Sequence, residues 1–278
     1  TGLIDSARRV LLVHAHPDDE TLATGALIAD LVARGVEVHV VTATRGERGE
    51  LMPGVVDVEP GSEAFVAHRE GELAKALSHL GVRHHCFLGM PPARDRAHRT
   101  SRRYRDSGMR WIREGLAGPA KDAPADAFTI VPLTEPVADL AAYVEATAPD
   151  VLVSYDAGGG YGHPDHVRTH EVTREVARAH GIPVIEVIPP DREVDGDAAA
   201  IEWTDGSTHL ATVQAALRAH VLRQLVDLDP SALSGEGALA AVHELAQIEK
   251  AVAAARMFCA HRVATTDAWR GQGHASAA

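Results

Sequence analysis

The sequence predicts an α/β protein with a Rossmann-like, mostly parallel sheet flanked by helices and a small C-terminal helical portion. In the first half of the chain, short β-branched apolar segments alternate with helix-like segments, and the alternation returns after residue 128. Two Ala- and Leu-rich segments follow the last strand-like segment. The 278 residues, 45% of them hydrophobic, suffice for one large core. We therefore expect a core that carries the candidate site at residues 1–190 and a helical portion at 191–278 packed on the same domain.

Each expected element rests on a local pattern. Strands are expected where Val, Leu and Ile gather between turn signals, at residues 10–14, 36–42, 82–88, 150–155 and 183–188. Helices are expected where apolar residues recur at helical spacing, at residues 21–34, 62–80, 135–147, 165–180, 207–226 and 236–257. Ser62 is a candidate N-cap, and Gly35 and Gly81 are helix stop signals. Residues 89–128, rich in Arg, Gly, Pro and Asp, predict a long loop region over the face that carries the site.

Charge and cysteine content restrict the expected partners and compartment. The net charge of −12 disfavours nucleic acid and anionic membrane surfaces, since both attract clustered Lys and Arg. No run of about 18 uncharged apolar residues occurs, so no membrane segment is expected. Cys86 and Cys259 are the only cysteines and make no disulfide framework, which indicates a reducing cytoplasm. The expected partner is a small polar ligand, and homo-oligomerisation stays open.

Two short clusters of histidine and aspartate carry the chemistry. The first, His16-Pro17-Asp18-Asp19-Glu20, follows the first strand, and the second, His163-Pro164-Asp165-His166, follows a glycine-rich turn after the strand at 150–155. Ligands of open α/β sheets bind at the carboxyl ends of strands, where both clusters lie. An acidic helix start explains the first cluster alone, but two matching turns disfavour that reading. Together they would supply His, Asp and His to one divalent ion and leave other groups for proton transfer.

The donor types indicate a catalytic metal rather than a structural one. Three nitrogen and oxygen ligands with an open position suit catalytic zinc, whereas a closed structural site would need paired cysteines. Iron(II) or cobalt would fit the same donors. Zinc lowers the pKa of its bound water toward about 7, so that a nearby carboxylate completes the deprotonation at neutral pH. Asp18 is well placed for that role, and we predict a zinc hydrolase.

The two clusters resemble the signature of the PIG-L/LmbE-like superfamily, zinc-dependent deacetylases that act on N-acetylglucosamine conjugates. The segments 42–50, 105–109, 155–156 and 159–162 are similar to those of the branch that serves mycothiol metabolism. Within that branch, the pattern is closest to the deacetylases of N-acetylglucosaminyl-inositol. The resemblance implies hydrolysis of the N-acetyl amide of such a conjugate, with release of acetate and the free amino sugar.

The resemblance also implies a role for each matched residue. The implied zinc ligands are His16, Asp19 and His166. Asp18 would be the general base, and Tyr161, on a mobile loop, would help to polarise the acetyl carbonyl. His163 would stabilise or protonate the tetrahedral intermediate, and Asp165 would orient the His163 ring. The implied substrate contacts are Arg69, Asp106, Glu47, Met109 and His220.

Other activities stay open at this stage. The superfamily also contains mycothiol S-conjugate amidases and deacetylases of antibiotic-linked or lipid-linked amino sugars. A non-catalytic sugar-binding protein on the same fold ranks lower, because no ligand or base of the two clusters is missing. A nucleotide-binding protein is rejected, because Ala15-His16-Pro17 stands where a glycine-rich phosphate loop would follow the first strand.

Overall fold

The computed structural model describes residues 2–49, 58–98, 100–113, 115–188 and 207–222. Its main sheet has five parallel strands in the order β3-β2-β1-β6-β7. The strands are β1 (Arg9–His14), β2 (Glu37–Thr42), β3 (His84–Phe87), β6 (Val151–Tyr155) and β7 (Val184–Val187). The strand order reverses between β1 and β6, which makes their carboxyl ends the topological switch point of the sheet. The predicted Rossmann-like α/β fold is confirmed.

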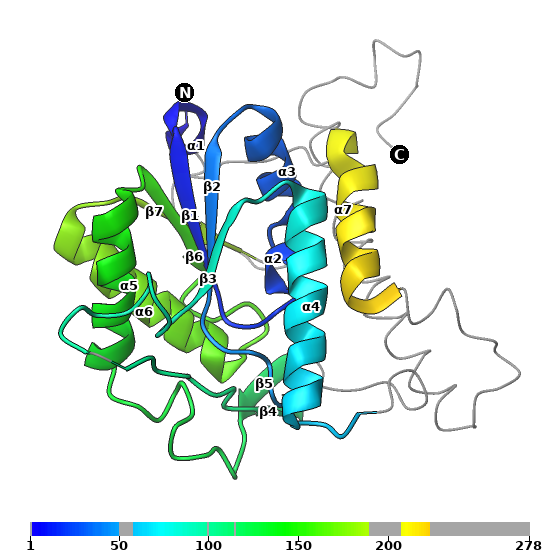
Figure 1. Cartoon of the computed structure of the whole chain (residues 1–278), viewed down its shortest axis with the longest axis vertical. Helices are drawn as coiled ribbons and strands as arrows, with labels where there is room; N and C mark the ends of the chain where they lie inside the picture. The colour runs from blue at the N-terminus through cyan, green and yellow to red at the C-terminus, as the bar shows by residue number, and fades with distance from the viewer. Residues whose placement is uncertain (1, 50–57, 99, 114, 189–206, 223–278) are drawn as a thin grey trace, which may run out of the picture.

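Helices cover both faces of this sheet (Figure 1). One face carries α2 (Asp19–Leu22), α3 (Gly25–Ala33), α4 (Glu63–Leu80) and α7 (Leu210–Leu217). The opposite face carries α5 (Thr134–Thr147) and α6 (Pro164–His180). A short helix, α1 (Leu3–Ser6), precedes β1. None of the described helices combines the length and the apolar character that crossing a bilayer requires.

The central strands β1, β2 and β6 are largely apolar on both sides because both sides of the sheet are covered there. Leu12 and Val40 are fully buried in the cluster shared with α3 and α4. Their neighbours Leu11, Val13 and Val41 are buried in the second cluster, shared with α5 and α6. This two-sided core gives the turns that follow β1 and β6 a rigid base.

The predicted ends of the longest helix are confirmed. The Ser62 side chain accepts a hydrogen bond from Phe65 N at 3.1 Å and caps α4. Gly81 ends the helix with a φ of 79°, a left-handed conformation that glycine adopts without a steric penalty.

The expected continuous helix at 21–34 is wrong, because the segment forms two helices, α2 and α3, separated at Thr24. Thr24 leaves the helical conformation with φ −131° and ψ 6°. Its hydroxyl donates to Glu20 O at 2.9 Å and lies 3.0 Å from His14 Nε2. Threonine side chains compete with the helical backbone in this way, and apolar periodicity does not reveal it.

The expected loop region at 89–128 contains a two-stranded antiparallel sheet that the sequence did not indicate. Its strands are β4 (Met109–Arg113) and β5 (Leu116–Pro119), placed near the lower end of α4 in Figure 1. Four of the five β4 residues are exposed, so the hairpin lacks the alternating pattern that predicts strands. Ala117 N donates to Tyr161 O at 2.8 Å, a tertiary contact that ties the hairpin to the loop after β6.

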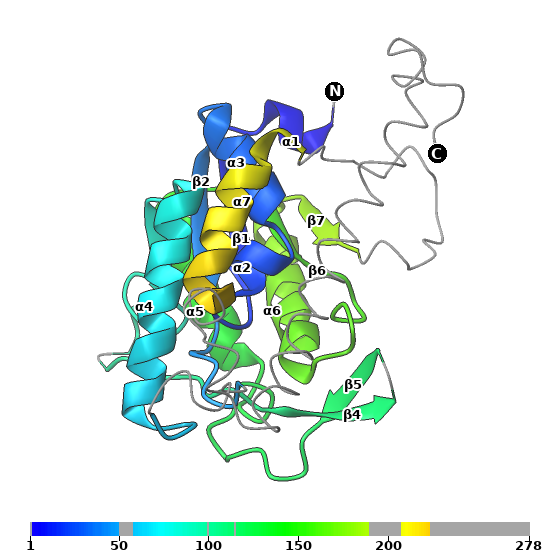
Figure 2. The ribbon, with the colours of Figure 1, turned by 90° about the vertical axis from the view of Figure 1, so that its right-hand side faces the viewer.

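The C-terminal helical portion is confirmed as far as the structure describes it. The chain passes from a short 3₁₀ turn (Ser207–His209) through α7 into a π-helical turn, η3 (Arg218–Leu222). Figure 2 shows α7 alongside α3 and α4, with which it is in contact. The expected helix at 236–257 and Cys259 lie outside the described residues, and the division at residue 190 stays a prediction.

His85 gives the fold a predicted sensitivity to acid. Burial, reinforced by the Arg45 guanidinium, lowers the pKa of this imidazole to about 4, and its Nε2 contacts Thr42 Oγ1 at 3.1 Å. Below about pH 6.5 the His85 imidazole is protonated in the unfolded chain, whereas in the folded chain it stays neutral down to about pH 4. The contribution of His85 to stability is therefore lost as the pH falls from 6.5 toward 4. The fall of the pKa from 6.5 to about 4 corresponds to about 3 kcal/mol. Since each kcal/mol corresponds to about 2–4 °C in a protein of this size, the loss should amount to roughly 6–12 °C.

The test is the Tm of the native chain and of His85→Gln between pH 7 and pH 4. The native Tm should fall more steeply than that of the variant, whereas the exposed His79 changed to Gln should leave the slope unaltered. Parallel curves for the native chain and His85→Gln would contradict the assignment.

Candidate active site

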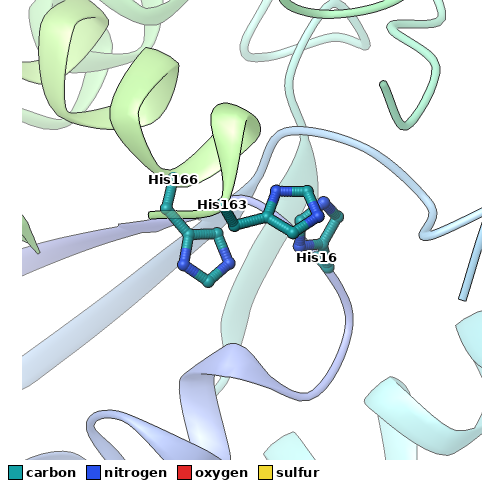
Figure 3. Close-up of side chains that lie close together, drawn as sticks. All are labelled: His16, His163 and His166. Carbon is teal, nitrogen blue, oxygen red and sulfur yellow. The ribbon is translucent and has the colours of Figure 1, made fainter. Parts of the chain in front are cut away.

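The two histidine and aspartate clusters meet at the switch point of the sheet. His16 lies on the loop after β1, and His163 and His166 lie at the start of α6, after β6 (Figure 3). The ring centroids of His16 and His163 are 4.5 Å apart, and those of His163 and His166 are 5.0 Å apart. All three rings are buried. The structure thus brings together residues separated by about 150 positions, as the paired motifs predict.

Asp19 joins the two turns. Its Oδ2 lies 3.3 Å from His16 Nδ1, and its Oδ1 lies 3.3 Å from His166 Nε2. Burial raises the pKa of Asp19, but the neighbouring His166 and His16 rings outweigh it and hold that pKa well below its ordinary value. One nitrogen each from His16, His163 and His166 also lie within 4.8 Å of one another. His163 is therefore an alternative to Asp19 as third ligand.

The donor set fits a divalent metal ion. Asp165 Oδ1 is buried and makes no hydrogen bond within the described part of the chain, and the buried His166 Nε2 has only its 3.3 Å contact with Asp19 Oδ1 there. Unsatisfied buried polar atoms are costly, and a cation satisfies lone pairs of this kind. Imidazole nitrogens and carboxylate oxygens are the donors that zinc takes in catalytic sites, and iron(II) or cobalt accept the same set.

Several contacts orient these donors. Tyr155 stacks on the His166 ring at 4.1 Å, and its hydroxyl accepts a hydrogen bond from Ala15 N at 2.9 Å. Asp165 Oδ2 accepts from Ser107 N at 2.9 Å and lies 3.1 Å from His16 Nε2. Neighbours that fix the rotamers of ligands are typical of metal sites. Tyr155 and Ser107 lie in segments that the resemblance singled out, but neither could be assigned a role in the site from the sequence, because aromatic stacking and a backbone donor do not show in residue types.

His163 is held as a neutral imidazole. Its Nδ1 accepts a hydrogen bond from Asp165 N at 3.1 Å. Burial, together with the His16 and His166 rings, lowers the pKa of His163 to about 3. The carboxylate of Asp165 lies against His16, so Asp165 contacts His163 through its backbone.

Asp18 stands at the edge of the donor set in an unusual backbone conformation. Its φ is 112°, a region that residues with a side chain rarely adopt. Arg69 Nη2 donates to Asp18 Oδ2 at 2.9 Å and also to Pro17 O. Burial raises the pKa of Asp18, and the Arg69 guanidinium opposes that rise. A strained, partly buried carboxylate beside a metal-binding set has the properties of a catalytic base.

Tyr161 lies on the glycine-rich loop after β6 and is 40% exposed. A Cβ at Gly159, where φ is 61°, would lie 2.8 Å from Val167 N, so the loop requires glycine there. The Tyr161 ring lies 5.2 Å from the His166 ring and 5.7 Å from that of Trp111 on β4. Burial and the nearby carboxylates, Asp19 first, raise its pKa, so the hydroxyl keeps its proton.

The expected substrate contacts lie in two places. Asp106 Oδ1 is 3.8 Å from His16 Nε2, and Asp106 N donates to Glu47 Oε2 at 3.1 Å. Both acids border a cavity of about 240 Å³, whose other lining residues are Arg48, Gly61, Arg105, Asp122 and Pro124. Met109 opens strand β4, beside this region in sequence. His220, by contrast, is buried and its Nε2 lies 2.7 Å from Glu20 Oε1.

Comparison with known proteins places the chain in a family. The family model described as PIG-L, GlcNAc-PI de-N-acetylase, matches residues 11–177, which contain both clusters. The chain belongs to the PIG-L family. That range begins within β1, ends within α6 and includes every expected ligand of the metal.

Curated PIG-L relatives are similar over most of this chain. The 1D-myo-inositol 2-acetamido-2-deoxy-alpha-D-glucopyranoside deacetylase of Kineococcus radiotolerans is 36% identical, over 81% of this chain and 72% of its own length. The protein of the same name from a Nocardioides species is 41% identical, over 76% of this chain and 66% of its own length. About a third of each relative therefore has no counterpart in the match.

Solved structures support the fold. The zinc-inhibited form of a teicoplanin deacetylase superposes with a TM-score of 0.54, covering 81% of this chain and 88% of that one. Sequence identity is 21%, so the similarity extends to the fold alone.

Proposed function

We propose that this PIG-L protein is a metal-dependent deacetylase of N-acetylglucosaminyl-inositol, which it hydrolyses to acetate and the free amino sugar. The observation that carries the proposal is the placement of the Asp18 carboxylate beside a buried set of His and Asp donors at the switch point. The names of the relatives that share 36% and 41% identity support the choice of substrate. The net charge of −12 suits a small uncharged ligand better than a polyanion, and we place the reaction in the cytoplasm.

We assign the metal to His16, Asp19 and His166, with zinc as the preferred ion and iron(II) or cobalt as substitutes. When bound, such an ion polarises a carbonyl group and makes a water molecule more acidic. The choice of Asp19 over His163 rests on the resemblance to the family and on the Asp19 carboxylate, whose two oxygens lie 3.3 Å from His16 Nδ1 and 3.3 Å from His166 Nε2. His163 is then left for the substrate.

Asp18 acts as the general base in this proposal. Its carboxylate takes a proton from the attacking water and then delivers it to the leaving amine, so no proton is lost or gained over the cycle. Arg69 donates to one carboxylate oxygen of Asp18, which leaves the other oxygen for the water. The raised pKa of Asp18 makes it a stronger base than an ordinary aspartate.

His163 stabilises the tetrahedral intermediate. Because its Nδ1 accepts a hydrogen bond and the ring is neutral, the ring proton resides on Nε2. Nε2 is then a donor for the oxygen that becomes negative when water attacks the amide carbonyl. A neutral donor of this kind favours stabilisation over protonation as the role of His163.

Tyr161→Phe should lower kcat by roughly a hundredfold or more. The hydroxyl is a second donor to the same oxygen, and loss of one such donor costs about 2.7–4 kcal/mol in the transition state. The measurement is acetate release at saturating substrate, with metal content determined on the same samples. Phe retains the ring contacts with His166 and Trp111, so a kcat within a few-fold of the native value would exclude this role.

The polar cavity suits the polyhydroxylated part of the substrate. Its lining combines the carboxylates of Glu47, Asp106 and Asp122 with the guanidinium groups of Arg48 and Arg105. Alternating acceptors and donors match vicinal hydroxyl groups, each of which both donates and accepts. We therefore assign Glu47 and Asp106 to substrate binding, and the resemblance to the family adds Arg69 and Met109, which are not among the residues that line this cavity.

A substrate panel tests the proposal. Metal-loaded protein is assayed for amine release from N-acetylglucosamine, N-acetylglucosaminyl-inositol and a mycothiol S-conjugate, and the three kcat/KM values are compared. The proposal predicts the highest value for the inositol conjugate. Preference for the S-conjugate would make the protein an amidase instead. Binding of the sugars without turnover of any of them would indicate a sugar-binding protein.

A further inference from the structure

His220 and Glu20 form a buried pair between the C-terminal helix and the turn that carries Asp18. His220 Nε2 lies 2.7 Å from Glu20 Oε1, although the two residues are 200 positions apart in the sequence. The two side chains are 4% and 0% exposed. A buried pair of this kind is costly to break, because removal of one partner leaves the other without a counterpart.

The second oxygen of Glu20 holds the backbone of Asp18. Glu20 Oε2 accepts a hydrogen bond from Asp18 N at 2.9 Å, whereas the Thr21 hydroxyl donates to Oε1, the oxygen that His220 contacts. Asp18 has a φ of 112°, which a residue with a side chain retains only when its surroundings hold it there. Glu20 is one of these restraints, and Arg69, bonded to Pro17 O and the Asp18 carboxylate, is another.

The helix before His220 fixes where its ring reaches the turn. α7 is in contact with α2, α3 and α4. It packs against α3 at van der Waals distance, since a Cβ at Gly25 would lie 3.5 Å from Val213 Cγ1. The segment 207–222 therefore presents His220 to Glu20 from a packed helix, and Glu20 passes that restraint to Asp18.

We propose that His220 is a positioning residue, which acts through Glu20 to keep the Asp18 carboxylate in its reactive orientation. The effect of His220 on kcat rests on the proposed deacetylation, whereas its effect on the conformation of the turn at Asp18 does not. His220 contacts no substrate in this scheme, because its ring is buried against Glu20. The C-terminal segment thereby contributes to turnover at a site built from the first and sixth strands.

The kinetic test compares His220→Ala with His209→Ala. His209 lies on the same segment, and its Nε2 is 3.6 Å from Asp30 Oδ1. Among the described residues it makes no contact with the turn that carries Asp18. His220→Ala should lower kcat per metal-loaded chain by about tenfold to a hundredfold, the usual result of a misplaced catalytic group, with KM within about twofold. His220→Gln should recover most of the loss, because its amide N–H can still reach Glu20. His209→Ala should keep the native kcat.

Amide hydrogen exchange tests the same inference without catalysis. Asp18 N–H should exchange faster in His220→Ala than in the native chain, and at the native rate in His209→Ala. If His220→Ala does not fold, His220→Phe, which keeps a ring but lacks the donor, takes its place. Unchanged exchange at Asp18 and unchanged kcat would overturn the inference, as would equal losses in the His209 and His220 variants. Altered exchange in a chain without deacetylase activity would instead contradict only the proposed function.

Discussion

Asp18→Asn is expected to lower kcat by about 10²–10⁴-fold, the usual contribution of a general base, while the bound metal stays at the native amount. Asparagine keeps the size of the side chain and an oxygen for Arg69 Nη2, which lies 2.9 Å from Asp18 Oδ2 in the native chain. It has no carboxylate to take the proton from water. The expected loss is thus chemical rather than structural.

Acetate release and metal analysis of the same preparation measure this effect. Asp30→Asn is the matched control, since Asp30 lies on the neighbouring helix α3 and pairs with Arg34 rather than with the site. The control should turn over at the native rate. Near-native turnover by metal-replete Asp18→Asn would remove Asp18 from the role of base.

His166→Ala is expected to remove the metal and, with it, the activity. Loss of an outer-shell partner already weakens metal binding by about 10–100-fold, and loss of a direct ligand should exceed that. The substitution also removes the ring on which Tyr155 stacks, so folding has to be checked by circular dichroism. Metal content after dialysis against a buffered zinc solution is the primary measurement.

His180→Ala is the control for His166→Ala. His180 is the last residue of the same helix. Its Nδ1 donates to Val176 O at 2.9 Å, and its Nε2 lies 3.7 Å from Glu145 Oε1. This variant should retain metal and activity. Native metal content in His166→Ala would instead remove His166 from the set of ligands.

The parts of the fold that rest on local chemistry could be predicted from the sequence. Apolar β-branched segments predicted the strands of the main sheet, and Ser62 and Gly81 marked the ends of α4 correctly. The meeting of His16 with His166 could also be predicted, because both clusters follow strands and parallel strands end on the same edge of a sheet.

Features that depend on tertiary contacts could not be predicted. The β4–β5 hairpin is mostly exposed and is held by Ala117 N on Tyr161 O, so its sequence has no strand pattern. The break at Thr24 comes from a hydroxyl bonded to the backbone of the preceding turn. The Glu20–His220 pair joins positions 200 residues apart, and no local pattern links them.

The most direct test of the account is a zinc titration of the metal-stripped chain, with acetate release from N-acetylglucosaminyl-inositol measured at each addition. The account predicts negligible release without metal and a rate that rises with bound zinc until roughly one ion per chain is held at the His16, Asp19 and His166 site. Full-rate acetate release by the metal-free chain would contradict it, and so would a zinc-loaded chain that releases none.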